Sequence, residues 1–188
     1  MTTHYIDITL LVDPEFSHAH LLGALMAKLH RALVELGSSS IGISFPQYRL
    51  RPRSLGSTLR LHGTPDALQD LMALTWLQGM RDHVRLTDLA AAPPGAPHCV
   101  VRRRQFKTSV ERLRRRRMRR KGETTEQAAV AIPDSVERQV DLPFVRLSSV
   151  STGQPFCLFL AQEPAHEVRE GMSFNAYGLS QGGTVPWF

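Results

Sequence analysis

HYIDITL, residues 4–10, places apolar side chains at every second position, and this period of two predicts a β-strand with one buried face. The segment LLGALMAKLHRALVEL, residues 21–36, repeats leucine at helical spacing and ends before Gly37, a residue that commonly closes helices. The chain then continues with two strands, a helix and a strand: IGISF (41–45), STLRLH (57–62), TPDALQDLMAL (64–74) and HVRLTDL (83–89). The order strand-helix-strand-strand-helix-strand predicts a ferredoxin-like domain, the arrangement that RNA-recognition sheets share.

A stretch rich in alanine and proline, AAAPPGAP at residues 90–97, predicts a linker after this domain. We therefore expect an α+β protein of 188 residues with two domains, 1–92 and 93–188. The second domain should be a smaller α+β unit that carries an arginine-rich helix at about 109–121.

The arginine-rich segment is the most unusual part of the sequence. ERLRRRRMRR, residues 111–120, holds seven arginines. On a helical wheel five of them fill one broad face: Arg112, Arg115, Arg116, Arg119 and Arg120. No apolar stripe is left to seat this helix in a core, and arginines at positions i and i+4 repel one another. The segment is therefore predicted to bind a large anion.

Charge is unevenly distributed along the chain. Between Val100 and Lys121, twelve Lys or Arg stand against one acid, Glu111, for a net charge of +11; because the whole chain carries +6, the remaining residues carry −5. One concentrated basic element on an acidic body indicates a directed surface for nucleic acid. A membrane-surface helix would need large apolar residues on its opposite face, and this segment lacks them. A localisation signal or a solvated tail stays open as an alternative.

Arginine grips phosphate bidentately, so this helix would position a duplex or a hairpin stem without reading its sequence. Arg103 and Gln105, just before the helix, suit the Hoogsteen edges of guanine and adenine, or they are solvated strand residues. Phe156 could stack on a base or belong to the core. The sheet of the first half offers only Tyr5 and Phe45, so stacking of single strands is not expected to be its main mode of binding.

The sequence predicts no metal site and no cofactor. His18 and His20 form an HxH pair that no nearby carboxylate or cysteine completes, and no paired acids suggest a two-metal nuclease. Cleavage of RNA would therefore be metal-independent, with a histidine as the base that deprotonates a ribose 2′-OH. His30 lies at the edge of the leucine face and is either such a base or a structural boundary residue. Ser149 and Ser151 could hold the 2′-OH or a phosphate oxygen.

Cys99 and Cys157 match no disulfide framework or zinc spacing, and both lie among apolar residues, so we expect two buried free thiols. The N-terminus has no signal-peptide pattern, and no apolar run approaches the length of a membrane span. The default expectation is a cytosolic or nuclear protein, and we take the cytoplasm as its location.

Several motifs occur in an order that resembles one family. They are KLH (28–30), ERLRRR followed by MRR (111–120), DLPFV (141–145), STGQ-x-F (151–156) and YGLS-x-GG-x-VPWF (177–188). Their order and the C-terminal VPWF make the chain similar, nearly end to end, to the type I-F CRISPR repeat-processing endoribonucleases. These are the Csy-type nucleases that mature guide RNA in antiviral defence.

The resemblance implies an activity, a substrate and partners. Such enzymes bind the stem-loop of the CRISPR repeat with the arginine helix in the major groove of the stem. They cut at the 3′ base of the stem without metal and leave a 2′,3′-cyclic phosphate. They then stay bound to the mature guide RNA as a subunit of the interference complex.

The resemblance also implies catalytic roles for three residues. His30 corresponds to the catalytic histidine, Ser149 to the catalytic serine, and Tyr177 would orient the active site. Because the segment reads SSVST, Ser148 is an alternative to Ser149.

The resemblance also implies which residues bind RNA. Arg103 and Gln105 would read bases near the bottom of the stem, in a register that could shift by one residue within RRRQFK, and Phe156 would be the stacking aromatic beside the loop. Arg117 replaces an expected apolar residue, which should leave the helix less well seated without RNA. The remaining contacts would come from the groove helix and the STG motif, namely Arg112, Arg115, Arg116, Arg119, Arg120, Ser151 and Thr152.

Two rival functions remain: a hairpin-binding subunit without cleavage activity, and a binder of double-stranded DNA. The sequence does not specify the repeat that is recognised, the turnover, or whether the system is nuclease-bearing or transposon-associated.

Overall fold

The computed structural model describes residues 2–105, 110–134, 140–149, 153–167 and 173–188. Its contacts divide the chain into two compact units, Met1–Arg104 with Leu142–Phe188, and Gln105–Asp141. The expected division between residues 92 and 93 differs from this grouping and stays a prediction.

The two-residue period at the N-terminus does form a strand, β1 (His4–Leu10), whose apolar side chains are buried. It lies inside a five-stranded antiparallel sheet of order β2-β5-β1-β6, in which β7 also pairs with β1. The partner strands are β2 (Gly42–Ser44), β5 (Thr58–Gly63), β6 (Val84–Leu86) and β7 (Ala90–Ala91). Strand β7 comes from the stretch expected to be a linker, so that expectation is wrong for residues 90 and 91.

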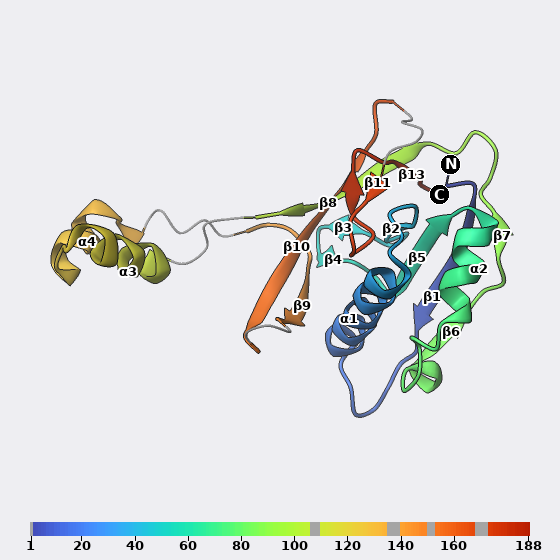
Figure 1. Cartoon of the computed structure of the whole chain (residues 1–188), viewed down its shortest axis with the longest axis horizontal. Helices are drawn as coiled ribbons and strands as arrows, with labels where there is room; N and C mark the ends of the chain where they lie inside the picture. Colours follow the sequence, from blue (N-terminus) through green and yellow to red (C-terminus); the bar gives the residue numbers. More distant parts are fainter. Residues whose placement is uncertain (1, 106–109, 135–139, 150–152, 168–172) are drawn as a thin grey trace. The chain divides into compact units, whose positions relative to one another are not determined.

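Two helices pack on this sheet, as their leucine spacing predicts (Figure 1). Helix α1 (His18–Leu36) begins at Ser17, whose side chain accepts a hydrogen bond from the His20 backbone N–H, and closes at Gly37 in the left-handed conformation. Helix α2 (Pro65–Ala73) begins with proline at its first position, where no helical N–H partner is lost.

A second antiparallel sheet, of order β13-β8-β10-β9, shares the same hydrophobic core. Its strands are β8 (His98–Arg104), β9 (Phe144–Ser148), β10 (Pro155–Pro164) and β13 (Val185–Pro186). Gln162 of β10 joins it to the first sheet, because its side-chain amide accepts from Phe45 N at 2.8 Å and donates to Phe45 O at 3.1 Å. The two halves of the sequence therefore bury their apolar residues together.

Two short hairpins complete the first unit: β3 (Arg49–Leu50) with β4 (Arg53–Ser54), and β11 (Ser173–Phe174) with β12 (Ser180–Gln181). A single 3-10 turn, Arg81–His83, precedes β6. The C-terminal Phe188 lies against the first sheet, where Arg60 donates to its main-chain oxygen at 2.7 Å and also pairs with Asp7 at 2.7 Å.

The second unit contains helix α3 (Val110–Lys121), within the predicted range of about 109–121, and helix α4 (Thr125–Ala131). With four α-helices and several antiparallel sheets among the described residues, the predicted α+β class is confirmed. No helix in those ranges is long and apolar enough to cross a membrane.

The two cysteines differ in burial. Cys99 is a buried free thiol as expected, and burial raises its pKa to about 12. Cys157 is free but only half-buried, so the expectation of a buried thiol is wrong at this position. It alternates onto the other face of β10 from the buried Leu158 and Leu160.

Candidate active site and nucleic-acid interface

His30 lies in the C-terminal half of α1, between the buried Leu29 and the exposed side of the helix. Its Nδ1 is 2.8 Å from the main-chain oxygen of Ala176. A carbonyl oxygen can only accept a hydrogen bond, so Nδ1 must carry the proton. In the neutral ring the lone pair therefore lies on Nε2, which is the arrangement that a general base requires.

Tyr177 holds the same imidazole from one face. The two ring centroids are 3.9 Å apart and the rings are nearly parallel, at 3°. Carbonyl and phenol ring together fix the position and the orientation of His30. The structure thus brings together two of the three predicted catalytic residues, which are 147 positions apart in the sequence.

The loop that carries Ala176 and Tyr177 is held by its own side chain and by β2. Asn175 Oδ1 accepts hydrogen bonds from the backbone N–H groups of Tyr177, at 2.8 Å, and Leu179, at 3.1 Å. Gly178 adopts a φ of 72°, and its oxygen accepts from Ile43 N at 3.0 Å. These hydrogen bonds therefore hold the loop Asn175–Leu179 in place. Sequence reasoning missed Asn175, although an Asn three residues before a glycine is a recognisable turn signal.

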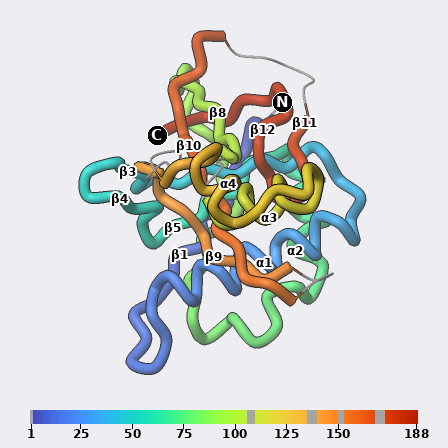
Figure 2. Tube along the Cα trace, turned by 90° about the vertical axis from the view of Figure 1, so that its left-hand side faces the viewer, coloured from blue at the N-terminus to red at the C-terminus, as the bar shows by residue number. Residues whose placement is uncertain are grey.

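Ser149 directly follows β9, and its main chain hydrogen-bonds to the residues just before β10. Its N–H donates to Gln154 O at 2.9 Å, and its own carbonyl oxygen accepts from Gly153 N at 2.8 Å. The hairpin packs on the helix that carries His30, since a Cβ at Gly23 would lie only 2.6 Å from Arg146 O (Figure 2). The hairpin and α1 thus belong to one packed assembly.

The two candidate serines, Ser148 and Ser149, differ in exposure. Ser148 is the last residue of β9 and is exposed, whereas Ser149 is half-buried. The choice between them stays a prediction. Ser151 and Thr152 lie outside the described residues.

Arg103 and Phe156 are neighbours in space. The Arg103 guanidinium carbon lies 5.9 Å from the centroid of the Phe156 ring, at the outer limit of a cation–π contact. Phe156 is half-buried and packs against the hydrophobic core, as expected for a core residue. Because the residue is not fully buried, stacking on a base stays a prediction. Gln105, the first residue of the second unit, is exposed.

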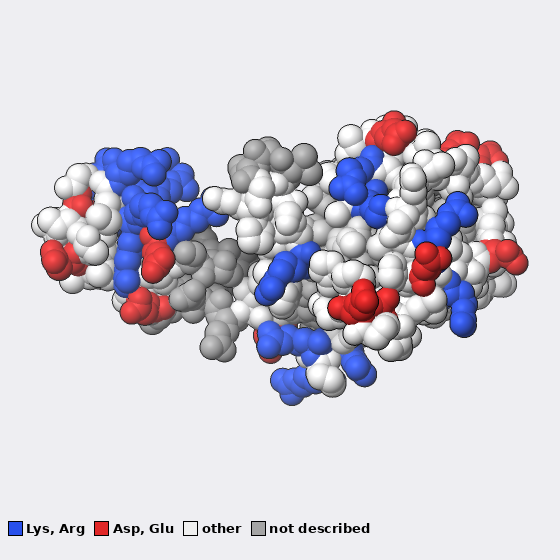
Figure 3. Space-filling model, turned by 90° about the horizontal axis from the view of Figure 1, so that it is seen from below, with Lys and Arg blue, Asp and Glu red and all other residues white. Residues whose placement is uncertain are grey.

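Helix α3 has two kinds of arginine. Five of them are exposed and follow the spacing i, i+3, i+4, i+7 and i+8, as the helical wheel predicts: Arg112, Arg115, Arg116, Arg119 and Arg120. Basic side chains gather over this helix (Figure 3). Val110 is the one buried residue of the helix. The exposed arginines form a continuous cationic face.

The other two arginines bind within the second unit. Arg114 pairs with Asp134 at 2.9 Å and donates to Ile132 O at 2.9 Å. Arg117 makes a two-pronged pair with Glu123, at 2.6 and 3.0 Å, and this hydrogen bond holds the pKa of Glu123 below its usual value. Arg117 therefore has a partner within this unit, and the expectation that the helix is less well seated without RNA stays a prediction. An ion pair takes the place of apolar packing.

No three His, Cys, Asp or Glu side chains among the described residues gather in a group that could hold a metal ion. The candidate site consists of the oriented imidazole of His30 on α1, Ser149 after the strand β9 that packs on that helix, and the pair of Arg103 and Phe156 on the second sheet.

Residues 5–188 match the family model described as "CRISPR-associated protein (Cas_Csy4)". The chain is 48% identical over 185 residues to the CRISPR-associated endonuclease Cas6/Csy4 of Pseudomonas aeruginosa (strain UCBPP-PA14), covering 98% of this chain and 99% of the relative. It is 40% identical over the same length and coverage to the protein of that name from Escherichia coli (strain UTI89 / UPEC).

A solved structure titled "An RAMP protein binding different RNA substrates" aligns over 98% of this chain and 99% of its own, with a TM-score of 0.35 and 11% identity. The family match and the two relatives extend over nearly the whole sequence. They show that the chain belongs to the Cas_Csy4 family of CRISPR-associated proteins.

Proposed function

We propose that this chain is an endoribonuclease that binds the stem-loop of CRISPR repeat RNA and cleaves it at the 3′ base of the stem without a metal ion. The observation that carries the proposal is the geometry of His30. Its Nδ1 donates to Ala176 O and its ring stacks on Tyr177, so Nε2 is left to take a proton. Family membership and two relatives named as endonucleases support it.

In the proposed reaction, Nε2 of His30 removes the proton of the ribose 2′-OH at the base of the stem. The 2′-oxygen attacks the adjacent phosphorus, and the bond from phosphorus to the 5′-oxygen of the next nucleotide breaks. That oxygen leaves as a 5′-hydroxyl, with a proton from the imidazolium formed in the first step. The stem keeps a 2′,3′-cyclic phosphate.

Ser149 is proposed to hold the 2′-OH in line with the phosphorus, and Tyr177 to orient the base. General acid–base catalysis contributes typically about 10²–10⁴-fold to a rate. Alignment of the 2′-OH with the phosphate would supply much of the remainder.

RNA recognition is proposed to divide between the two units. The exposed arginines of α3 would bind stem phosphates, which fixes position without reading sequence. Arg103 and Gln105 would read the bottom of the stem and Phe156 would stack beside the loop, with Ser151 and Thr152 as further contacts. The strand order β2-β5-β1-β6, with two helices on the sheet, supports a ferredoxin-like layout for the first part of the chain.

After cleavage, the protein is proposed to stay on the hairpin of the guide RNA as a subunit of the type I-F interference complex, in the cytoplasm. A hairpin-binding subunit without cleavage activity is the alternative.

The variant His30→Ala separates these two functions. The enzyme proposal predicts that hairpin affinity changes little while the cleavage rate falls by about 10²–10⁴-fold, because only the base is lost. His20→Ala, an exposed histidine of the same helix, is the matched control and should cleave normally. Unchanged cleavage by His30→Ala would contradict the proposal, and a wild-type protein that binds the hairpin but never cuts it would favour the alternative.

A further inference from the structure

A hollow of about 760 Å³ lies at the start of α1, at the opposite end of that helix from His30. Three elements far apart in the sequence form it: the first turns of α1, the β3–β4 hairpin and the beginning of β9. Its lining includes His18, Leu22, Arg49, Arg53, Ser57 and Phe144. All of them belong to the first compact unit.

The hollow is suited to an anion. Arg49 and Arg53 are both exposed, and Arg51 lies between them in the same short hairpin. Among the described residues that line the hollow there is no Asp or Glu, and the first turn of α1 carries no acid. Its charged lining is therefore cationic throughout.

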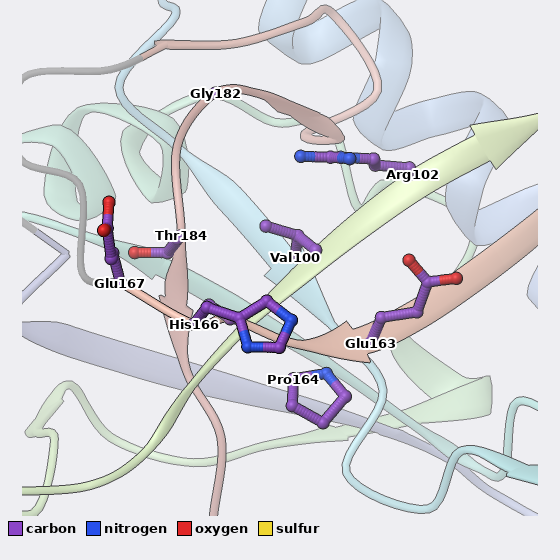
Figure 4. Close-up of a pocket in the computed structure, with 9 residues that line it drawn as sticks. Val100, Arg102, Glu163, Pro164, His166, Glu167, Gly182 and Thr184 are labelled. Atoms are coloured by element: carbon purple, nitrogen blue, oxygen red, sulfur yellow. The ribbon is translucent and has the colours of Figure 1, made fainter.

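A second hollow, of about 510 Å³, shows the contrast. It lies beside β8 and β10, where Arg102 and His166 share the lining with Glu163 and Glu167 (Figure 4). Glu163 pairs with Arg104 at 2.9 Å. Two carboxylates in the lining repel phosphate, so this second hollow does not match the chemistry of the first.

Phe144 adds an aromatic surface to the cationic hollow. Its side chain is 44% exposed, and its ring lies 5.4 Å from that of Phe159 on the neighbouring strand. An aromatic ring beside a guanidinium is the combination that binds single-stranded nucleic acid, because a base stacks on the ring while a phosphate pairs with the cation. An acidic protein segment would use the arginines but would gain nothing comparable from the ring.

Two elements lead from this hollow to the proposed cleavage site. Along helix α1, the rise from His18 to His30 is about 18 Å at 1.5 Å per residue. Strand β9 runs from Phe144 to the turn at Ser149. A strand of RNA that leaves the base of a bound stem would therefore meet the hollow after a few nucleotides.

We propose that this hollow binds the single-stranded RNA that flanks the stem on its 5′ side, with phosphates on Arg49 and Arg53 and a base on Phe144. The inference rests on the proposed function, which places the base of the stem at His30. Cleavage at the 3′ base leaves the 5′ flank attached to the hairpin, so the hollow would hold RNA both before and after the reaction.

The test compares two product-type RNAs: the hairpin alone, and the hairpin with a single-stranded 5′ extension. Neither contains the scissile bond, so dissociation constants can be measured by fluorescence anisotropy on wild-type protein. The extension should tighten binding, and each phosphate that it adds to the contact should steepen the salt dependence by about 0.7 in log K against log salt.

The double variant Arg49→Ala/Arg53→Ala should bind the hairpin alone like wild type and lose the gain from the extension. Phe144→Leu keeps an apolar side chain and should lose part of that gain. Arg85→Ala, an exposed arginine on β6 outside the hollow, is the matched control and should keep it. Thermal unfolding of each variant checks that it folds.

Three results would overturn the inference: an extension that adds no affinity, a gain that survives in the double variant, or polyglutamate competing as well as a single-stranded oligonucleotide. Each of them leaves the proposed function standing if the hairpin itself binds and its uncut precursor is cleaved. Failure of the hairpin to bind or be cleaved would instead count against the proposed function.

Discussion

The imidazole of His30 is fixed by contacts that no local pattern contains. The KLH motif and the leucine spacing predict where the residue lies on its helix, and that prediction is confirmed by a half-buried side chain at the edge of the apolar face. The Ala176 carbonyl that sets its tautomer lies 146 residues away. Such a contact depends on how the C-terminal loop packs on α1, which periodicity cannot reveal.

The Asn175 side chain gives a prediction at the same scale. Asn175→Ala removes the acceptor of two backbone N–H groups and should loosen the loop that holds Ala176 against His30. We expect unfolding free energy to fall by about 1–3 kcal/mol, and the cleavage rate to fall while hairpin affinity stays close to wild type. Denaturant unfolding and single-turnover cleavage measure the two effects.

Asn175→Asp keeps an acceptor oxygen in the same place and should recover most of the loss. A loss of stability in Asn175→Ala with a fully retained cleavage rate would show that the loop does not position the His30 imidazole for cleavage.

Among the elements, the exposed face of α3 could be predicted from the sequence, but the ion pairs that two of its arginines make could not. The wheel identifies the cationic face because helical geometry alone determines it. The pairs of Arg117 with Glu123 and of Arg114 with Asp134 depend on the turn after the helix, where the chain reverses to bring acids back beside it. The run of seven arginines therefore contains two that make structural ion pairs beside five that are exposed.

Strand β5 carries a titratable group whose effect on stability can be predicted. His62 has no exposed surface, and Ser44 Oγ lies 2.8 Å from its Nε2. Burial, followed by the charge of Arg60, lowers the pKa of His62 to about 3. Because this folded-state pKa lies below the unfolded value of 6.5, the neutral ring stabilises the fold fully above pH 6.5.

As the pH falls from 6.5 toward 3, His62 should cost stability at about 1.4 kcal/mol per pH unit. We expect His62→Gln to be less stable than wild type at pH 7 but to lose less on acidification to pH 5. Urea unfolding at both pH values measures the difference, with His166→Gln, an exposed histidine, as the control. Equal pH dependence in wild type and His62→Gln would contradict the assignment.

At the scale of the molecule, the sequence predicted the class and most elements but not how the halves combine. Residues 90–97 have a linker composition, yet Ala90 and Ala91 pair with β1, and the second sheet packs into the core of the first. Composition registers proline and glycine, whereas the shared core arises from apolar faces that each half leaves uncovered. Contacts between the halves depend on tertiary packing, which composition does not describe, and the boundary between residues 92 and 93 stays a prediction.

The cationic face of α3 predicts how the whole protein responds to salt. If about five stem phosphates are contacted, log K for the hairpin should fall against log salt with a slope of about −3.5 to −4.5. Arg116→Ala should reduce the steepness by a little under one unit, and Arg85→Ala should leave it unchanged. A slope near zero for the wild-type protein would contradict the role given to the helix.

The central claim is that the protein cleaves RNA through the ribose 2′-OH, with His30 as the base and no metal ion. The most direct test incubates the associated repeat RNA with the protein in EDTA, beside a copy that carries a single 2′-deoxy substitution at the cut site. We predict that the first RNA is cleaved at the 3′ base of its stem, with a 2′,3′-cyclic phosphate on the product, and that the second is bound but intact. Cleavage of both RNAs, or of neither despite tight binding, would contradict the claim.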